Sequence, residues 1–248
     1  GGARVVGFAK GAGMIEPHLA TMLVYILTDA DVAREELDQA LHDAVEESFN
    51  RISVDSDEST SDTVVAMSTR LQPAEDLEEF RSALTDICSA LADDVVRNGE
   101  GTNHVIKLAI SGAPSKADAV ALGRSVVNSP LFKCAVAGND PNVGRLVAAV
   151  GKFIGDMPSR PSLDQCRMRM GGRQIFSEGR FDLSPQIENE LVQHMASAEL
   201  GDDGEAAFPR HKRTVDIEVD LGAGDESATL LGSDLTHAYV TVNADYRS

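Results

Sequence analysis

Apolar side chains recur with the period of an α-helix in two segments of the first hundred residues. Within residues 32–49, an apolar residue stands at every fourth position, at Leu37, Leu41, Val45 and Phe49. Acidic residues fill much of the rest, so one face of this segment should be buried and the other exposed to water. Residues 74–97 carry a second apolar stripe, and the Asn98-Gly99 pair that follows is a typical helix stop. Both segments are therefore predicted to be helices.

Shorter runs of apolar and β-branched residues, bounded by polar breaks, predict strands. Four such runs stand at residues 21–27, 104–110, 214–221 and 238–243. Further helices are predicted at residues 117–127, 142–150 and 185–196. Within residues 158–212, the sequences Pro-Ser-Arg-Pro, Gly-Gly and Gly-Asp-Asp-Gly predict hairpin turns and surface loops around a short helix. The alternation of helices and strands predicts a layered α/β fold with helices packed on β-sheets.

The length and hydrophobic content of the chain allow a substantial core. It has 248 residues, of which 42% are hydrophobic, and no segment has the composition of a disordered linker. We therefore expect one compact unit. No run of 18 or more apolar residues is present, and residues 1–20 lack the pattern of a signal peptide, although the gene can start upstream. These observations favour a cytoplasmic protein.

The charge of the chain restricts its partners. The formal net charge is −18 and the isoelectric point is near 4.6, so nucleic acids and anionic membrane surfaces should be repelled. Small molecules are better candidate partners. Surface carboxylates also keep proteins soluble, so the acidity is not interpreted as a sign of a particular substrate.

The residues that commonly bind metals do not form a recognisable metal motif. Cys88, Cys134 and Cys166 lie far apart without a Cys-x-x-Cys pair, as expected in a reducing compartment. The six histidines show no His-Glu-x-x-His spacing. Residues 55–63 combine acidic and hydroxyl side chains but lack the glycine and terminal glutamate of a calcium loop. We therefore expect no metal, and we expect a hydrogen-bonded structural turn at residues 55–63.

One hydroxyl residue stands between a glycine-rich approach and an apolar run. Residues 10–23 read Lys-Gly-Ala-Gly-Met-Ile-Glu-Pro-His-Leu-Ala-Thr-Met-Leu, which places Thr21 just before the predicted strand. Cleavage between Ala20 and Thr21 would give the threonine a free α-amine with a pKa of about 7.7–8.0, which is a built-in general base at neutral pH. The alternative is an ordinary turn before a strand.

This segment resembles the cleavage region of the ornithine acetyltransferase, or glutamate N-acetyltransferase, family, whose precursors cut themselves before the threonine of Ala-Thr-Met-Leu. Further segments resemble the same family in the same order along the chain. They are residues 50–63, Asn98-Gly99-Glu100-Gly101-Thr102, Val127-Asn128-Ser129-Pro130-Leu131, residues 138–145 and residues 243–248. The resemblance spans nearly the whole chain and thins only between about residues 155 and 213.

The resemblance implies a fold and an activity. The fold would be the layered α/β type of self-cleaving enzymes with an N-terminal nucleophile. Residues 1–20 would end an upstream α chain, and residues 21–248 would form a β chain that pairs with it in an α2β2 heterotetramer. The enzyme would move acetyl from N2-acetylornithine to glutamate through an acetyl ester on Thr21, without a cofactor. Whether acetyl-CoA also serves as a donor stays open, and the oxyanion-hole residues are expected upstream of this chain.

The resemblance also implies substrate-binding residues besides Thr21. Lys10 would bind an α-carboxylate and Glu100 would bind the ornithine ammonium, where small neighbours let a ligand approach closely. Asn243 and Ser248 would hold carboxylate or acetyl oxygens. Lys10 and Glu100 could instead be ordinary surface charges, and Asn243 and Ser248 could belong to a plain terminal strand followed by a polar end.

The segment Gly138-Asn139-Asp140-Pro141-Asn142-Val143-Gly144-Arg145 is a marker of the family, but its role is open. Free amides at the start of a helix near Pro141 would favour an anionic ligand, or the segment is a structural junction between loop and helix. Val143 stands where the family usually has tryptophan. This departure could reshape a pocket wall and puts the usual substrate pair in doubt.

Two other functions remain open from the sequence. A self-cleaving amidohydrolase or aminopeptidase of similar design would pass the acyl group to water instead of glutamate. An amino-acid-binding paralogue would remain uncleaved and would catalyse nothing. The intact mass of the protein and the dependence of acetyl release on glutamate discriminate between the three.

Overall fold

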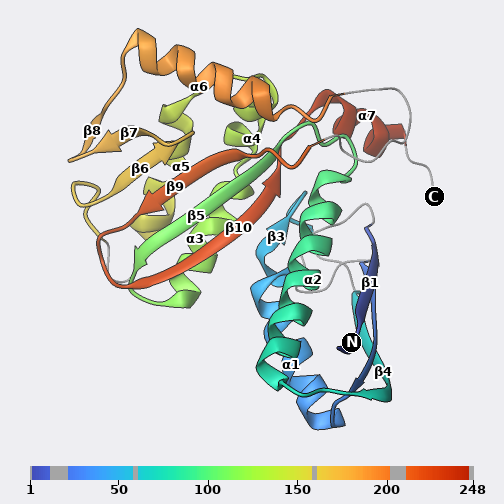
Figure 1. The fold of residues 1–248 in the computed structure, drawn as a ribbon. Coiled ribbons are helices and arrows are strands. Elements are labelled where there is room, and N and C mark those ends of the chain that lie inside the picture. The colour runs from blue at the N-terminus through green and yellow to red at the C-terminus, as the bar shows by residue number, and fades with distance from the viewer. Residues whose placement is uncertain (1, 12–21, 58–60, 158–160, 202–210, 246–248) are drawn as a thin grey trace. The chain divides into compact units, whose positions relative to one another are not determined.

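The computed structural model describes residues 2–11, 22–57, 61–157, 161–201 and 211–245 (Figure 1). By their spatial contacts, the residues form two compact units, Gly1–Gly99 and Glu100–Ser248. Each unit packs helices on a β-sheet, in agreement with the predicted α/β class. The predicted division of the protein between residues 20 and 21 concerns a covalent cut, and it stays a prediction.

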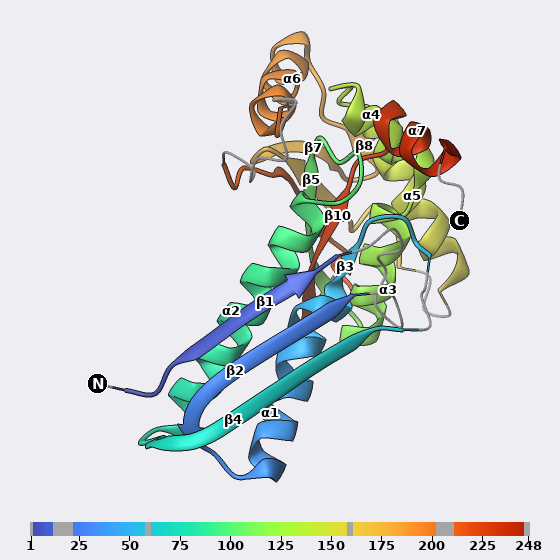
Figure 2. The same ribbon diagram turned by 90° about the vertical axis from the view of Figure 1, so that its right-hand side faces the viewer.

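The first unit is a three-stranded sheet with two helices. The strand order is β1-β2-β4, formed by Val5–Lys10, Leu23–Asp31 and Thr63–Pro73, with β1 antiparallel and β4 parallel to β2. Helices α1 (Arg34–Glu47) and α2 (Leu77–Arg97) lie on one side of the sheet (Figure 2). A 3-10 turn at Phe49–Arg51 and the short strand β3 (Ile52–Ser53) complete the unit.

The alternation of side chains along β2 explains why the helices cover only one face of this sheet. Val24 and Ile26 are buried, whereas the neighbouring Tyr25 points to the exposed face beside Phe8. Gly7 lets β1 approach α2 closely, because an added Cβ would lie 2.8 Å from the Cδ1 atom of Leu91. The second face of the sheet keeps several apolar side chains exposed, namely Val6, Phe8, Tyr25, Leu27 and Met67.

The second unit is built on a mixed sheet whose strands run in the order β10-β5-β9-β6-β7-β8. Their bounds are Val105–Ala113 for β5, Arg167–Met170 for β6, Arg173–Ser177 for β7, Arg180–Phe181 for β8, Val215–Asp220 for β9 and Glu226–Ser233 for β10. Strands β5 and β9 are parallel, and the other neighbours are antiparallel.

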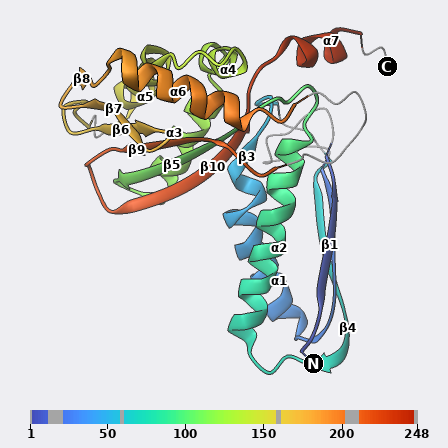
Figure 3. The same ribbon diagram turned by 45° about the horizontal axis from the view of Figure 1, so that its top comes forward.

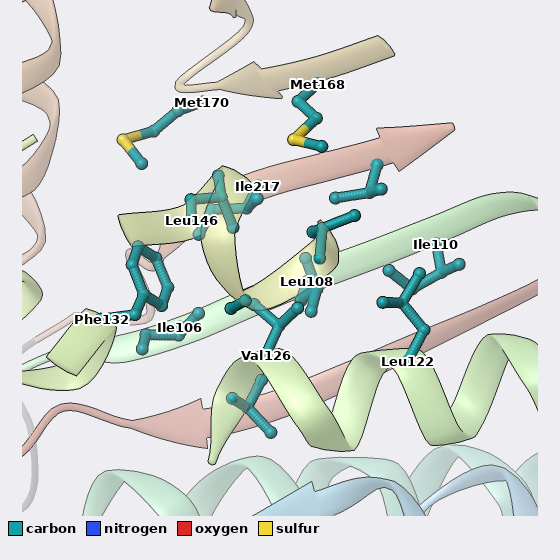
Figure 4. Close-up of a cluster of buried hydrophobic side chains, with 14 of the residues drawn as sticks. Ile106, Leu108, Ile110, Leu122, Val126, Phe132, Leu146, Met168, Met170 and Ile217 are labelled. Carbon is teal, nitrogen blue, oxygen red and sulfur yellow. The ribbon is translucent and has the colours of Figure 1, made fainter. Parts of the chain in front are cut away.

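The helices of the second unit are α3 (Lys116–Val127), α4 (Pro130–Ala137), α5 (Val143–Asp156), α6 (Pro185–Ala198) and α7 (His237–Asp245). The first three pack their apolar sides against the sheet, where Leu122, Phe132 and Leu146 meet Leu108 and Ile217 (Figure 4). Helix α7 follows β10 and lies apart from the other helices of this unit (Figure 3). Its described residues contribute no buried side chain.

The predicted elements agree with the structure except at the C-terminal end. The helices predicted at 32–49, 74–97, 117–127, 142–150 and 185–196 correspond to α1, α2, α3, α5 and α6, and the strands at 21–27, 104–110 and 214–221 correspond to β2, β5 and β9. Residues 238–243 were predicted to be a strand, which is wrong, because they belong to α7.

The misassigned segment is β-branched, but its neighbours provide helical hydrogen bonds. The hydroxyl of Thr236 accepts the backbone N–H of Tyr239 at 3.1 Å and so caps the start of α7. Within the helix, the Asn243 side chain donates to the Tyr239 carbonyl at 3.1 Å. No helix within the described ranges is long and apolar enough to cross a bilayer.

Candidate functional site

Three of the predicted site residues lie outside the described residues. These are Ala20 and Thr21 at the expected cut and Ser248 at the end of the chain. Lys10, Glu100 and Asn243 are described, as is Met22, which follows the candidate nucleophile directly. The surroundings of Lys10 and Met22 are therefore described within the first unit, and those of Glu100 and Asn243 within the second.

Lys10 lies in line with the start of the strand that follows Thr21. It is the last residue of β1, and in the antiparallel register its partner is Leu23, the first residue of β2. Its side chain is exposed, and its Nζ atom donates to the carbonyl oxygen of Gly11 at 3.4 Å. The sheet thus brings Lys10 opposite a residue only two positions after Thr21.

Both backbone groups of Met22 are hydrogen-bonded to residues at the start of β4 or just before it. Its backbone N–H donates to the Oδ1 atom of Asp62 at 2.5 Å, and its carbonyl oxygen accepts the N–H of Thr63 at 2.9 Å. Its side chain is only 1% exposed. The N–H that Asp62 accepts belongs to the peptide bond between Thr21 and Met22, so this carboxylate holds the chain next to the candidate nucleophile.

Asp62 sits in an environment that shifts its titration. Burial raises the pKa of this carboxyl above its ordinary value, and the N–H of Met22 opposes the rise because it stabilises the carboxylate. The sequence interpretation missed this role, since Asp62 was grouped with residues 55–63 as part of a structural turn. One local turn bond is present there, from the N–H of Asp57 to Asp55 at 3.2 Å.

Glu100 and Asn243 meet although they are far apart in the sequence. The Nδ2 atom of Asn243 donates to the Oε2 atom of Glu100 at 3.3 Å, across a sequence separation of 143 residues. Both side chains are exposed, so the carboxylate retains room for a cationic partner. The structure therefore brings two of the predicted substrate-binding residues together.

The small residues around Glu100 serve a different contact from the one expected. Gly101 has a φ of 66°, and a Cβ atom there would lie 2.2 Å from the backbone nitrogen of Tyr239. The Thr236 hydroxyl also donates to the Gly101 carbonyl oxygen at 2.6 Å. Glycine at 101 thus allows the close approach of α7, and it is this helix, rather than a ligand, that fills the space.

The segment at residues 138–145 is a junction between loop and helix. Asn142 caps α5, because its Oδ1 atom accepts the N–H of Arg145 at 3.2 Å. This bond uses one of the amides that an anionic ligand would need. Val143 is 2% exposed and belongs to the hydrophobic core of the second unit, so its side chain faces apolar neighbours.

Among the described residues, the metal-binding side chains and one cavity were compared with the predicted site residues. Within the described ranges, no three His, Cys, Asp or Glu side chains are grouped so as to hold a metal ion. A cavity in the first unit is lined by residues such as Val5, Pro73 and Phe80, and none of the predicted site residues lines it.

Comparison with known proteins gives a consistent result. The sequence profile of the ArgJ family matches residues 1–248. The chain is 35% identical over 246 residues to "Arginine biosynthesis bifunctional protein ArgJ" of Rhodococcoides fascians and 41% identical over 261 residues to the protein of that name from Rhizobium meliloti. It is 38% identical over 252 residues to "Glutamate N-acetyltransferase" of Methanopyrus kandleri.

The extent of these matches differs between sequences and structures. The three alignments cover 99–100% of this chain but 57–60% of the relatives, so the chain spans less than two thirds of their length. The crystal structure of ArgJ from Bacillus halodurans matches with a TM-score of 0.75 and 30% identity, covering 90% of this chain and 98% of the solved chain. This match confirms the predicted fold class.

Proposed function

Because this chain belongs to the ArgJ family, we propose that it is the catalytic part of a glutamate N-acetyltransferase that takes acetyl from N2-acetylornithine. Thr21 is its nucleophile, and the products are ornithine and N-acetylglutamate. The observation that carries the proposal is the register of β1 and β2, which sets Lys10 opposite Leu23 at the start of the strand that follows Thr21.

The first step is self-cleavage. The Thr21 hydroxyl attacks the carbonyl carbon of Ala20, the peptide nitrogen leaves as the α-amine of Thr21, and water hydrolyses the resulting ester. The products are a carboxylate at Ala20 and a free amine at Thr21. The bonds from Asp62 and Thr63 to Met22 support this step, since they restrain the residue next to the nucleophile.

The second step transfers acetyl. The Thr21 hydroxyl attacks the acetyl carbonyl of N2-acetylornithine while the α-amine of Thr21 accepts its proton. The C–N bond breaks, the proton passes to the departing nitrogen of ornithine, and an acetyl ester remains on Thr21. The amine of glutamate then attacks this ester and restores the hydroxyl. An ester intermediate makes a nucleotide or a metal unnecessary for the transfer.

The proposed binding groups match the charges of the substrate. Lys10 offers an ammonium to the α-carboxylate, and Glu100 offers a carboxylate to the side-chain ammonium of ornithine. Asn243 orients Glu100 through its 3.3 Å bond. The amide of Asn243 and the hydroxyl of Ser248 bind substrate oxygens. A substrate with one negative and one positive end is therefore favoured.

The coverage of the solved chain supports processing in this family. The B. halodurans chain is covered over 98% of its length, whereas the curated sequences are covered over 57–60%. A solved chain that is short relative to full sequences is expected if the precursor is cut into two chains. We propose an α2β2 heterotetramer in the cytoplasm, and native mass spectrometry would measure its composition.

Intact mass spectrometry and a transfer assay test the proposal together. The wild type and Thr21→Ala are expressed with any residues encoded before Gly1, and acetyl transfer from N2-acetylornithine is assayed with and without glutamate. We expect a cut wild type with glutamate-dependent transfer and an uncut, inactive Thr21→Ala variant. Acetyl release at a rate that does not depend on glutamate would indicate the amidohydrolase. An uncut wild type without turnover would indicate the binding paralogue. Replacing the donor by acetyl-CoA tests the second activity.

A further inference from the structure

A histidine four residues after Glu100 is buried, and both of its ring nitrogens are hydrogen-bonded. His104 is 0% exposed and Asp234 is 3% exposed. The Nδ1 atom of His104 lies 2.8 Å from the Oδ2 atom of Asp234. The Nε2 atom lies 3.2 Å from the Oδ1 atom of Asn139. Neither nitrogen is therefore left without a partner.

The partners determine how many protons the ring carries. The Nδ2 atom of Asn139 donates to the carboxylate of Glu199, which fixes the orientation of the amide. The Oδ1 atom of Asn139 thus faces His104, and an amide oxygen only accepts, so Nε2 of His104 must be a donor. The carboxylate of Asp234 also accepts, so Nδ1 must be a donor as well. With Asp234 ionised, only the doubly protonated imidazolium satisfies both bonds.

The same carboxylate ties the ring to the backbone that carries Glu100. The Oδ1 atom of Asp234 accepts the N–H of Asn103 at 3.0 Å, and the N–H of Asp234 donates to the carbonyl oxygen of His104 at 3.1 Å. Asp234 therefore holds two consecutive residues of the segment that begins at Glu100.

The chain on the other side of Asp234 leads to Asn243. Two residues later, the Thr236 hydroxyl donates to the Gly101 carbonyl oxygen and accepts the N–H of Tyr239, which starts α7. Asn243 stands on that helix and reaches Glu100. Glu100 and Asn243 are thus joined directly through their side chains. The segments that carry them are also joined through the bonds of Asp234 to Asn103 and His104.

We infer that His104 is a buried imidazolium that acts as the positioning residue of the Glu100–Asn243 pair. The inference rests on the proposed function for its effect on substrate. The positive ring neutralises Asp234 in the interior, and its second N–H links the pair to Asn139 in the loop before α5. Opposite an ionised Asp234, a neutral ring would leave one of the two acceptors without a donor from His104, which is costly for a buried group.

The kinetic test compares three variants of the processed enzyme. His104→Gln removes the charge, His104→Lys retains it, and His194→Gln is the matched control. His194 lies in the same unit and accepts the N–H of Asp216 at 3.0 Å, so its ring is bonded to strand β9. We expect His104→Gln to raise the KM for N2-acetylornithine about tenfold with self-cleavage intact. His104→Lys should recover most of that loss, and His194→Gln should keep the wild-type KM.

The protonation state is tested separately on the wild type. Nitrogen-15 NMR of the assigned His104 ring at pH 7 should show two protonated nitrogens, and one unprotonated nitrogen would overturn the inference. An unchanged KM in a folded His104→Gln variant would also overturn it. If His104→Gln does not fold, Thr236→Val is the second test, because it removes the hydroxyl that joins Gly101 to the start of α7. It should raise the KM for N2-acetylornithine to a similar extent. If the wild type transfers no acetyl, the proposed function fails, while the NMR result and the Kd for N2-acetylornithine still decide the inference.

Discussion

At the scale of single residues, Asp62 is the side chain next to the expected cut whose removal should slow cleavage without abolishing it. We expect Asp62→Ala to slow the appearance of the cleaved chain about tenfold, because the peptide between Thr21 and Met22 loses a charge-assisted hydrogen bond of 2.5 Å. Asp62→Asn keeps an oxygen acceptor and should cut faster than Asp62→Ala. Time-resolved intact mass spectrometry measures both rates.

A second carboxylate on the same sheet provides the control for Asp62. Asp29 accepts the backbone N–H of Arg4 at 2.7 Å, near the other end of β2. Asp29→Ala should therefore cleave at the wild-type rate. Equal slowing in Asp29→Ala and Asp62→Ala would show that general loosening of the sheet, rather than the position of Met22, limits the cut.

Gly101 should tolerate no side chain, for two physical reasons that can be separated. Its φ of 66° disfavours alanine, and an added Cβ would lie 2.2 Å from the nitrogen of Tyr239. Gly172 has a φ of 75° with open space around it, so Gly172→Ala measures the backbone cost alone. In urea unfolding, we expect Gly172→Ala to lower the free energy of unfolding by about 1 kcal/mol and Gly101→Ala to lower it by at least twice as much. Equal losses would mean that α7 moves away without cost.

The three cysteines should differ in reactivity. Burial raises the pKa of the Cys88 and Cys166 thiols to about 11 each, so both stay protonated at pH 8. Cys134 is exposed. We expect iodoacetamide to add one group to the folded chain at pH 8, on Cys134, and three groups after denaturation. Rapid labelling of Cys88 or Cys166, seen by peptide mass mapping, would contradict their burial.

At the scale of elements, the start of α5 depends on one amide side chain. Asn142→Ala removes the cap on the N–H of Arg145 and should lower the free energy of unfolding by about 1 kcal/mol. Ser129 precedes α4 without a side-chain cap bond, so Ser129→Ala should change stability little. Thermal unfolding of the two variants makes the comparison, and a Ser129→Ala loss as large as that of Asn142→Ala would refute the assignment.

The elements that could be predicted from the sequence are those whose partners lie within the same element. The stripe on α2 is periodic, and Asp76 caps its start by accepting two backbone N–H groups. Helix α7 was not predictable in this way, because the Thr236 cap stands outside the β-branched run and Asn243 is fixed partly by Glu100. Strands β1, β4 and β10 and helix α4 were also missed, since no clear period marks them.

At the scale of the whole molecule, some of the residues discussed above could be predicted from the sequence and others could not. Lys10, Glu100 and Asn243 were predicted because they stand in segments that resemble a family, and the structure brings Glu100 and Asn243 together. Asp62, His104 and Asp234 were not predicted, because their partners are 40 or 130 residues away in the sequence. No local spacing encodes such a bond, so only the folded chain reveals it.

The long sequence separation between Glu100 and Asn243 also has a consequence for the timing of biosynthesis. The two residues are 143 positions apart, and ribosomes add about 5–20 residues per second. Roughly 7 to 29 seconds must therefore pass between the synthesis of Glu100 and that of its partner. During this interval the growing chain carries the carboxylate without the amide that orients it, so the pair can form only after Asn243 has been synthesised.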